Sequence, residues 1–558
     1  MKSIFSNIVY AILVAAVFSS CHKIDVPVKS ELTPDVYPRT EAQFNSVTGP
    51  VYTSLRSDFA TTYWFIQSLS TDEAILPIYG ADWIDGFKYQ ELHRHTWTKD
   101  NAWVAAAWSY LANIIGTTNQ TIYIVNQSNP GDTRNTSLAE MKTMRAYTYY
   151  MMMDLFGNVP LDTAYGTTTL QAKATRVEVF NFVESELKAS IPYLKTASGA
   201  TTYGKPNRYL AFSLLAKMYL NAEYYTGTQR YNDCIAACDS VINAGGGTQY
   251  ALEPRASYLQ MFYPTNGPAM KEFIFAIPFD ASTSNGYMLH GRYDLNRNLG
   301  VRYLYSGSTA GTNVDPVMNG TTGNGLVNNK PSGPRATLAS YYAYFNDPND
   351  IRNNQWLTGP QYWQDGTPVM VKTTKVGYDQ FYAGADGGAT YTYPLVLDPN
   401  ITSRLGAGSY DLGKDEIAWN MGIRNIKFLP DYTNTTSRNQ NNDVPVFRYS
   451  DILLMKAEAI LRGGTPTLGH TALSLVNMIK AVRTTSAPLG SVTLTDIYTE
   501  RCREFAWESW HRNDMIRFGK YEDSYGLNKT NTDIYRRIFP IPTTALATNG
   551  KLVQNPGY

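Results

Sequence analysis

Acidic and aromatic side chains follow one another over residues 72–97 without the spacing of a helix or a strand. The rings lie among glycines and carboxylates, as in Tyr-Gly-Ala-Asp-Trp-Ile-Asp-Gly at 79–86. A ring offers a flat apolar face, and the polar groups beside it exchange hydrogen bonds. This mixture suits non-covalent recognition of a ligand with apolar C–H faces and many hydroxyls, as in a carbohydrate. The residues selected here are Asp72, Tyr79, Asp82, Trp83, Asp85 and Tyr89.

Trp83 is the first candidate for a stacking residue, because it is a large aromatic in a polar loop. The alternative is a tryptophan that folds back and plugs the loop from inside. Trp103 and Trp108 differ, because they lie on a helical period and are expected in the core. A second set of candidates lies in the glycine-rich and asparagine-rich middle of the chain, namely Tyr287, Arg292, Asn296, Tyr303, Trp356, Trp363 and Tyr382.

Two segments have the glycine–lysine spacing of a phosphate-binding loop, Gly408–Lys414 and Gly199–Lys205. The next residues are Asp415 and Pro206, where magnesium coordination needs a serine or threonine hydroxyl. No clear strand precedes either segment, and no G-x-S-x-G elbow occurs in the chain. We therefore predict neither nucleotide binding nor serine hydrolase chemistry.

His93 and His95 could ligate a metal from a strand, but no cysteine or third histidine is close to them. Cys234 and Cys238 are four residues apart on an expected helix, a spacing that does not normally allow a disulfide, and Cys502 is distant. We interpret these cysteines as small buried residues and predict no metal site and no cofactor. Whether Ca²⁺ contributes is left open by the sequence.

Glu500, Glu504 and Glu508 recur at helical spacing, interleaved with Arg501 and Arg503. Paired carboxylates can act as acid and base in glycoside hydrolysis. Alternating opposite charges on one face more often form ion pairs between packed helices. We interpret this group as structural and predict that the protein is not an enzyme.

The N-terminus reads as a secretory signal over residues 1–20. Lys2 supplies a positive charge, and the apolar run Ile8–Phe18 is too short to span a bilayer. Small residues precede Cys21, which resembles the site of acylation in bacterial lipoproteins, although Phe18 stands where leucine is usual. We expect residues 21–36 to form a lipidated tether. The alternative is a secreted protein without lipid.

The chain has 558 residues, of which 43% are hydrophobic and only 17% charged, a composition that indicates an ordered protein with a large core. Its net charge is +1, and one positive charge lies in the leader, so the mature chain is nearly neutral. No basic run is present to follow a phosphate backbone, which argues against nucleic acid as a partner.

Helical periodicity dominates both ends of the chain. We expect one helix over 101–126, one from a Ser137–Glu140 capping box to Phe156, one over 177–194 and one that begins at Pro206. Further helices are expected over 231–243, 452–461, 468–483 and 494–518. The expected helix starts near Ser137, Thr175 and Pro206 lie 38 and 31 residues apart, close to the 34-residue tetratricopeptide period. The middle is irregular, apart from a predicted strand at 273–277. This divides the chain into helical 37–250, loop-rich 251–443 and helical 444–558, which together form one compact unit.

Five segments resemble the SusD/RagB family. They are Arg145–Pro160, the run Arg-Tyr-Ser-Asp-Ile-Leu-Leu-Met-Lys-Ala-Glu-Ala at 448–459, Glu500–Gly519, Phe539–Pro542 and the terminal Gln554–Tyr558. Their order is that of the family, and the resemblance covers the whole mature chain. Ser509 and His511 depart from the glycine and arginine that are usual there, in what we take to be a structural helix.

The resemblance implies a mainly α fold, with tetratricopeptide-like helix pairs as a scaffold and an irregular ligand-binding region. It also implies a lipoprotein on the outer membrane that faces outward and delivers oligosaccharide to a TonB-dependent transporter, without catalysis. Peptide binding on the same architecture is the alternative, and a surface glycosidase is a weaker one. The sugar and its linkage are left open, and the family's ligand residues do not transfer by motif.

Overall fold

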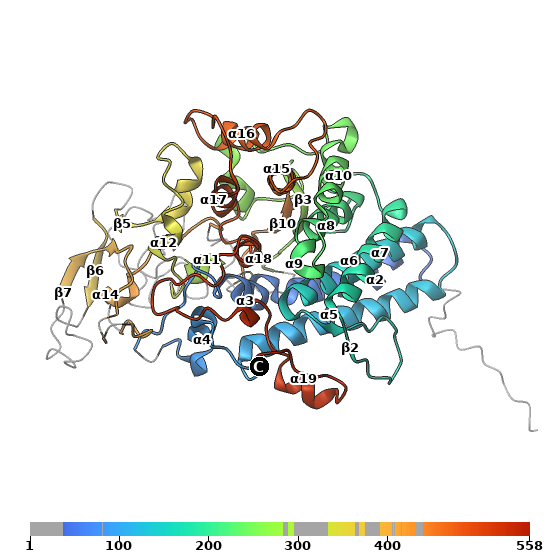
Figure 1. The fold of residues 1–558 in the computed structure, drawn as a ribbon, viewed down its shortest axis with the longest axis horizontal. Coiled ribbons are helices and arrows are strands. Elements are labelled where there is room, and N and C mark those ends of the chain that lie inside the picture. The colour runs from blue at the N-terminus through green and yellow to red at the C-terminus, as the bar shows by residue number, and fades with distance from the viewer. Residues whose placement is uncertain are drawn as a thin grey trace, which may run out of the picture.

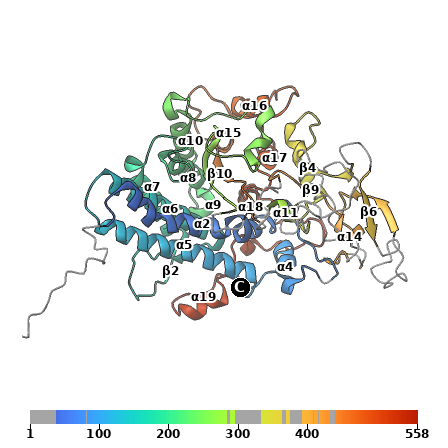
Figure 2. The same ribbon diagram turned by 180° about the vertical axis from the view of Figure 1, so that it is seen from behind.

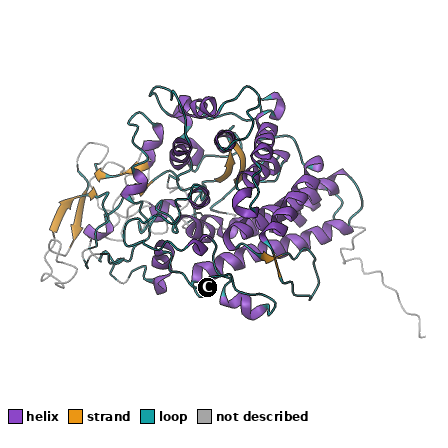
Figure 3. Cartoon of the chain, in the orientation of Figure 1, coloured by secondary structure: helices purple, strands orange, loops and turns teal. Residues whose placement is uncertain are grey.

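The computed structural model describes residues 37–80, 82–282, 288, 290–294, 333–362, 368–373, 391–403, 405–406, 408–413, 416–429 and 439–558. The predicted leader and tether, with Cys21, lie outside these residues. Helices make up about half of the described residues, and strands occur there only as short pairs (Figure 3). The predicted mainly helical fold is confirmed.

The N-terminal helices are long and lie side by side, at the right of Figure 1. Figure 2 shows α2 against α5 and α6. Asn101 caps α5 by accepting from the N–H groups of Trp103 and Val104, and Thr175 and Glu178 form a capping box on α7. The bounds are α2 Glu41–Asp58, α5 Ala102–Gln127, α6 Asp132–Phe156 and α7 Arg176–Ser190.

The predicted start of the next helix at Ser137 is wrong. Helix α6 begins at Asp132 after Gly131, and Ser137 and Glu140 are buried within it. Residues 132–136 contain no helix breaker, so the helix extends one turn further back than the capping pattern suggested. The expected burial of its second half and its end at Gly157 are confirmed.

The later helices stack beside the first group, with α8, α10 and α15 in succession and α16 and α17 against α15 (Figure 1). Asn207 caps α8, so Pro206 lies just outside the helix that it was expected to open. The bounds are α8 Arg208–Leu220, α9 Ala222–Thr226, α10 Tyr231–Ile242, α15 Tyr449–Leu461, α16 Ala472–Arg483, α17 Leu494–Glu504 and α18 His511–Arg517. The tetratricopeptide-like character of these pairs stays a prediction.

The single helix expected over 494–518 is interrupted. Between α17 and α18, Trp507 and Ser509 both adopt the left-handed region, each with φ of 65°. Ser509 therefore stands in a break and not in a helix, at a position where glycine would adopt the backbone without strain.

Within the described ranges the strands form five antiparallel pairs, of which β3 with β10 joins the middle of the chain to its C-terminal helices. The predicted strand at 273–277 is confirmed as β3. The pairs are β1 Val159–Pro160 with β2 Lys173–Ala174, β3 Phe273–Ile277 with β10 Val444–Arg448, β4 Trp356–Leu357 with β9 Arg424–Asn425, β5 Gly359–Pro360 with β8 Val396–Leu397, and β6 Met370–Thr373 with β7 Tyr391–Pro394. Short helices complete the fold: α3 Trp64–Ser68, α4 Lys88–Arg94, α11 His290–Asp294, α12 Ala339–Tyr342, α14 Glu416–Trp419 and α19 Thr543–Thr548.

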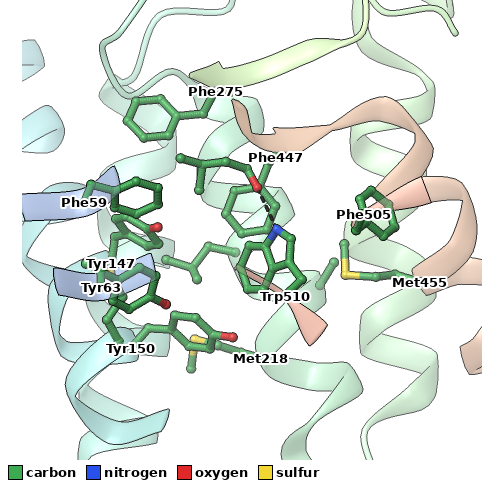
Figure 4. Close-up of a cluster of buried hydrophobic side chains, with 14 of the residues drawn as sticks. Phe59, Tyr63, Tyr147, Tyr150, Met218, Phe275, Phe447, Met455, Phe505 and Trp510 are labelled. Carbon is green, nitrogen blue, oxygen red and sulfur yellow. Dashed lines mark hydrogen bonds between the residues drawn. The ribbon is translucent and has the colours of Figure 1, made fainter. Parts of the chain in front are cut away.

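One large hydrophobic core runs through the molecule and takes residues from Val51 to Leu552. In the part shown in Figure 4, Phe447 packs against Trp510 with ring centroids 5.3 Å apart, and Tyr63 and Tyr147 belong to the same cluster. The indole N–H of Trp510 donates to the carbonyl of Val446 at 3.0 Å, so a buried polar group is paired within the apolar cluster.

A buried ion-pair network surrounds Glu504. Its carboxylate accepts from Arg448 at 2.7 Å, from Arg483 at 3.0 Å and from Arg352 at 3.0 Å. Burial alone would raise the pKa of Glu504, but these guanidinium groups hold it well below its usual value. The interpretation of Glu500, Glu504 and Glu508 as ion-pairing residues of the fold is confirmed. Their main arginine partners are distant in the sequence and are not Arg501 and Arg503.

His93 and His95 are buried and donate ring N–H groups to the carbonyls of Gly526 and Ser70 at 2.8 and 2.9 Å. Cys234, Cys238 and Cys502 are buried free thiols, as expected. Among the described residues, no three His, Cys, Asp or Glu side chains are grouped so as to hold a metal ion. The same part of the chain contains no helix long and apolar enough to cross a membrane.

Candidate functional site

The loop of residues 82–88, which we call the tryptophan loop, leads into α4 and includes its first residue, Lys88 (Figure 1). Three of its non-glycine residues have a left-handed backbone: Trp83 with φ of 63°, Asp85 with 35° and Phe87 with 63°. Such conformations cost of the order of 1 kcal/mol each and persist only where the surroundings impose them. The loop is therefore a constrained surface feature.

Apolar side chains of this loop face solvent. Phe87 is 49% exposed and Ile84 is 41% exposed, while Trp83 is half-buried. The rings of Trp83 and Tyr293 meet edge to face, with centroids 5.5 Å apart and planes at 90°, and the ring centroid of Tyr89 lies 6.3 Å from that of Trp83. Trp83 is thus supported on one side by aromatic rings and still reaches the surface.

Charged groups accompany these rings. Asp82 and Asp85 are exposed, and Asp85 lies 3.6 Å from the ammonium of Lys88. That ammonium also lies over the ring of Trp103 at 4.5 Å. Hydrogen-bond acceptors therefore stand beside exposed apolar faces, which is the arrangement that a polyhydroxylated ligand requires.

A buried aromatic stack holds the segment that enters the loop. The ring of Tyr79 lies on that of Trp419 with centroids 4.1 Å apart, and the Tyr79 hydroxyl donates to the carbonyl of Pro334 at 3.2 Å. The amide of Gly80 donates to Asp411 at 2.8 Å. These contacts tie the start of the tryptophan loop to the irregular middle of the chain.

Of the first predicted set, the structure brings Asp82, Trp83 and Asp85 together on the loop surface. The prediction that Asp72 and Tyr79 contact a ligand is corrected, because both side chains are buried and packed inside. Asp72 accepts from His511 at 2.7 Å, so it supports the fold and is not open to a ligand. Tyr89, also buried, forms part of the wall behind Trp83.

The second predicted set is only partly described. The prediction that Trp356 contacts a ligand is corrected, because its side chain is buried against Phe345 with ring centroids 5.0 Å apart. Arg292 lies in α11, but its side chain is outside the described residues. Also outside them are Tyr287, Asn296, Tyr303, Trp363 and Tyr382.

Sequence reasoning missed Ile84 and Phe87 as exposed apolar members of the loop. Their signal was a place next to or near Gly86, since glycine favours turns and turns run over the surface. The expectation that Trp108 belongs to the core is confirmed, and Trp103 packs against the same core while half-buried.

Two family models match the chain. One is described as the SusD family and matches residues 213–558, and the other is described as "Starch-binding associating with outer membrane" and matches residues 29–220. The starch-binding protein SusD of Bacteroides thetaiotaomicron is 24% identical over 440 residues, covering 75% of this chain and 72% of that protein. SusD-like protein P38 of Formosa agariphila is 22% identical over 579 residues, with 99% of each chain covered.

Solved structures share the fold. Surface glycan-binding protein A from Bacteroides thetaiotaomicron, in complex with laminarihexaose, superposes with a TM-score of 0.64 at 18% identity and covers 93% of this chain and 100% of that one. Surface glycan-binding protein A from Bacteroides fluxus gives a TM-score of 0.66 at 19% identity, with the same coverage. These relatives are named as binding proteins and not as enzymes.

Proposed function

Because the chain belongs to the SusD family, we propose that it is a non-catalytic surface protein that binds oligosaccharide through the tryptophan loop. The observation that carries this proposal is the constrained exposure of Trp83 and Phe87 beside the carboxylates of Asp82 and Asp85. A ring held in place before the ligand arrives loses little entropy on binding, so its contact area contributes more fully to affinity.

The proposal extends to the place of the protein in the cell. Acylation at Cys21 anchors it to the outer membrane, with the body facing outward, and it hands oligosaccharide to a TonB-dependent transporter. Its support is the predicted leader, the matched description that refers to the outer membrane and the family resemblance. An open surface loop gives a modest affinity, about micromolar to millimolar, and tethering beside the transporter offsets it by raising effective concentration.

Calorimetry on the purified chain without its leader tests the binding proposal. Maltohexaose and laminarihexaose are the probes, because starch and laminarihexaose are named with the relatives. We expect one of them to bind saturably and Trp83→Ala or Phe87→Ala to weaken that binding about tenfold or more. The matched control is Tyr193→Ala, an exposed aromatic on a different element.

Three outcomes contradict the proposal. Unchanged affinity in a folded Trp83→Ala, Phe87→Ala double variant removes the loop from the site. Binding of a peptide pool in place of both sugars favours the peptide alternative. Release of shorter sugars by the pure protein makes it a glycosidase.

The transporter partner needs its own experiment. Affinity capture of the intact lipoprotein from outer membranes should co-purify a barrel transporter, and absence of the transporter from the captured material contradicts delivery.

A further inference from the structure

A groove separate from the tryptophan loop lies where α5 and α6 meet β1 and residues 162–166, next to the strand pair that includes β2 in Figure 1. It encloses about 520 Å³, within the range of pockets that hold small molecules. Three aromatic side chains line it, Trp108, Tyr149 and Tyr165, together with the polar groups of Asn113, Asn119, Thr117, Gln120 and Asp162.

The indole of Trp108 provides a hydrogen-bond donor at this groove. Its side chain lines the groove and is only 8% exposed, with its ring edge against Phe156 at 5.0 Å and 81°. Within the described part of the chain, the indole N–H donates to no residue. This N–H is not among the fully buried unpaired groups of the described residues, so it is accessible from the groove and can donate to an acceptor placed there.

The groove wall is fixed by hydrogen bonds. The Tyr149 hydroxyl donates to the carbonyl of Asp162 at 2.6 Å and accepts from its N–H at 2.8 Å. Asn119 also donates to that carbonyl at 2.9 Å and accepts from Arg145 at 2.9 Å. The wall therefore needs no rearrangement before a ligand enters, which lowers the cost of binding.

The mouth of the groove carries a second aromatic surface. Tyr165 is 47% exposed, accepts from the Gln120 amide at 3.2 Å and lies 5.4 Å from the exposed ring of Tyr123. Of the described residues that line the groove, none is a lysine or arginine, and Asp162 is the one carboxylate. This charge pattern disfavours an anion and leaves a ligand recognised by ring faces and neutral hydrogen bonds.

We propose that this groove is a second carbohydrate site, which takes one or two neutral sugar rings with Tyr165 stacking at its mouth and Trp108 donating from within. The site shares no residue with the tryptophan loop, so it goes beyond the proposed function. With two sites on one body, a long glycan can be held at two points, and the second contact becomes an intramolecular step.

The test uses maltose, cellobiose and laminaribiose as probes. They are titrated by ligand-observed NMR onto the Trp83→Ala, Phe87→Ala double variant, in which the tryptophan loop is disabled. We expect saturable binding of at least one disaccharide near millimolar concentration, weakened about tenfold by Tyr165→Ala and several-fold by Trp108→Phe. In an indole ¹⁵N spectrum, the Trp108 N–H signal should move with the same saturation curve, while Tyr193→Ala changes nothing.

Absence of saturable binding below about 10 mM overturns this site. So does binding that Tyr165→Ala leaves unchanged, since Tyr165 is exposed and its loss does not threaten the fold. The two proposals fail separately. A tryptophan-loop variant that keeps its hexasaccharide affinity removes the loop site only, and a Tyr165→Ala protein that keeps its disaccharide affinity removes the groove site only.

Discussion

The ring of Tyr79 lies on that of Trp419 in a nearly parallel stack, with 13° between the planes. Both side chains are buried, and they join the segment before the tryptophan loop to helix α14 in the middle of the chain. The exposed rings of the loop thus depend on a contact that no ligand touches. A substitution inside this stack should change binding from a distance.

Trp419→Ala should lower the free energy of unfolding by about 3–5 kcal/mol, because it opens a large cavity under the loop. It should also weaken binding of the hexasaccharide that the wild type binds, since Trp83 and Phe87 lose part of their support. Trp419→Phe keeps a ring against Tyr79 and is the matched control. Chemical denaturation and calorimetry measure both effects, and full affinity in a destabilised Trp419→Ala protein contradicts the coupling.

Asp72→Asn should affect folding and not ligand binding. The change removes the negative charge that faces His511 at 2.7 Å in the interior. The amide oxygen can still accept from His511, but the bond is no longer charge-assisted, and hydrogen bonds to charged groups contribute about 1.5–3 kcal/mol. The free energy of unfolding should fall by up to this amount, while hexasaccharide affinity stays within about twofold of wild type. A tenfold weaker affinity in a folded variant would return Asp72 to the ligand site.

Glu504→Gln should be among the most destabilising single changes in the chain. It removes the one carboxylate charge that Arg448, Arg483 and Arg352 all contact, and leaves Glu272 as a buried carboxylate for the first two. Breaking a buried ion pair from one side costs about 3–5 kcal/mol. Urea denaturation measures the loss, and Asp523→Asn is the control, because its pair with Lys520 is exposed and 3.6 Å apart. Equal stability of the two variants would show that the network contributes little.

The helices expected over 101–126 and 177–194 correspond to α5 and α7 within a few residues at each end, because apolar periods act over a short stretch. A capping pattern alone was less reliable, since Ser137 and Glu140 lie inside α6. The break between α17 and α18 could not be predicted, because Trp507 and Ser509 carry no local signal for a left-handed backbone. Glycine is usual at the position of Ser509 in the family, which indicates a left-handed backbone there, whereas the surrounding pattern predicts a helix.

The candidate site stays a prediction, and the fold changes its membership. Trp83 is half-buried in a loop that nothing periodic surrounds in the sequence, and its role in stacking on a ligand stays a prediction. Asp72 and Tyr79 have the same residue types, yet their partners, His511 and Trp419, lie far away in the chain. Burial created by distant segments cannot be seen in a local pattern, so such residues look like ligand contacts until the fold is known.

Cys21→Ser should release the protein from the membrane. The serine cannot take the thioether-linked lipid, and nothing else in residues 1–36 is long enough to span a bilayer. After expression with the native leader in a bacterium that acylates lipoproteins, radiolabelled palmitate should label the wild type and not the variant. Labelling of both proteins, or membrane retention of the unlabelled variant, contradicts anchoring at this cysteine.

Asp443 should make stability depend on pH. Burial raises the pKa of its carboxyl to about 6, although the Tyr203 hydroxyl at 2.6 Å and the Phe279 N–H at 2.8 Å favour the charged form. Below pH 4 the carboxyl is neutral in both the folded and the unfolded chain. Between pH 4 and 6 the unfolded chain loses this proton first, so the contribution of Asp443 to stability falls as pH rises, by about 3 kcal/mol at most.

Asp443→Asn removes this titration and keeps an acceptor for the Phe279 N–H. The free energy of unfolding of wild type minus variant, from urea denaturation, should therefore be largest at pH 4 and decline by about 2–3 kcal/mol up to pH 7. Asp523→Asn, at an exposed carboxylate, should run parallel to wild type over this range. A difference that stays flat, or that grows with pH, means that the folded carboxyl is already ionised at pH 4, held by Tyr203 and Phe279 against the cost of burial.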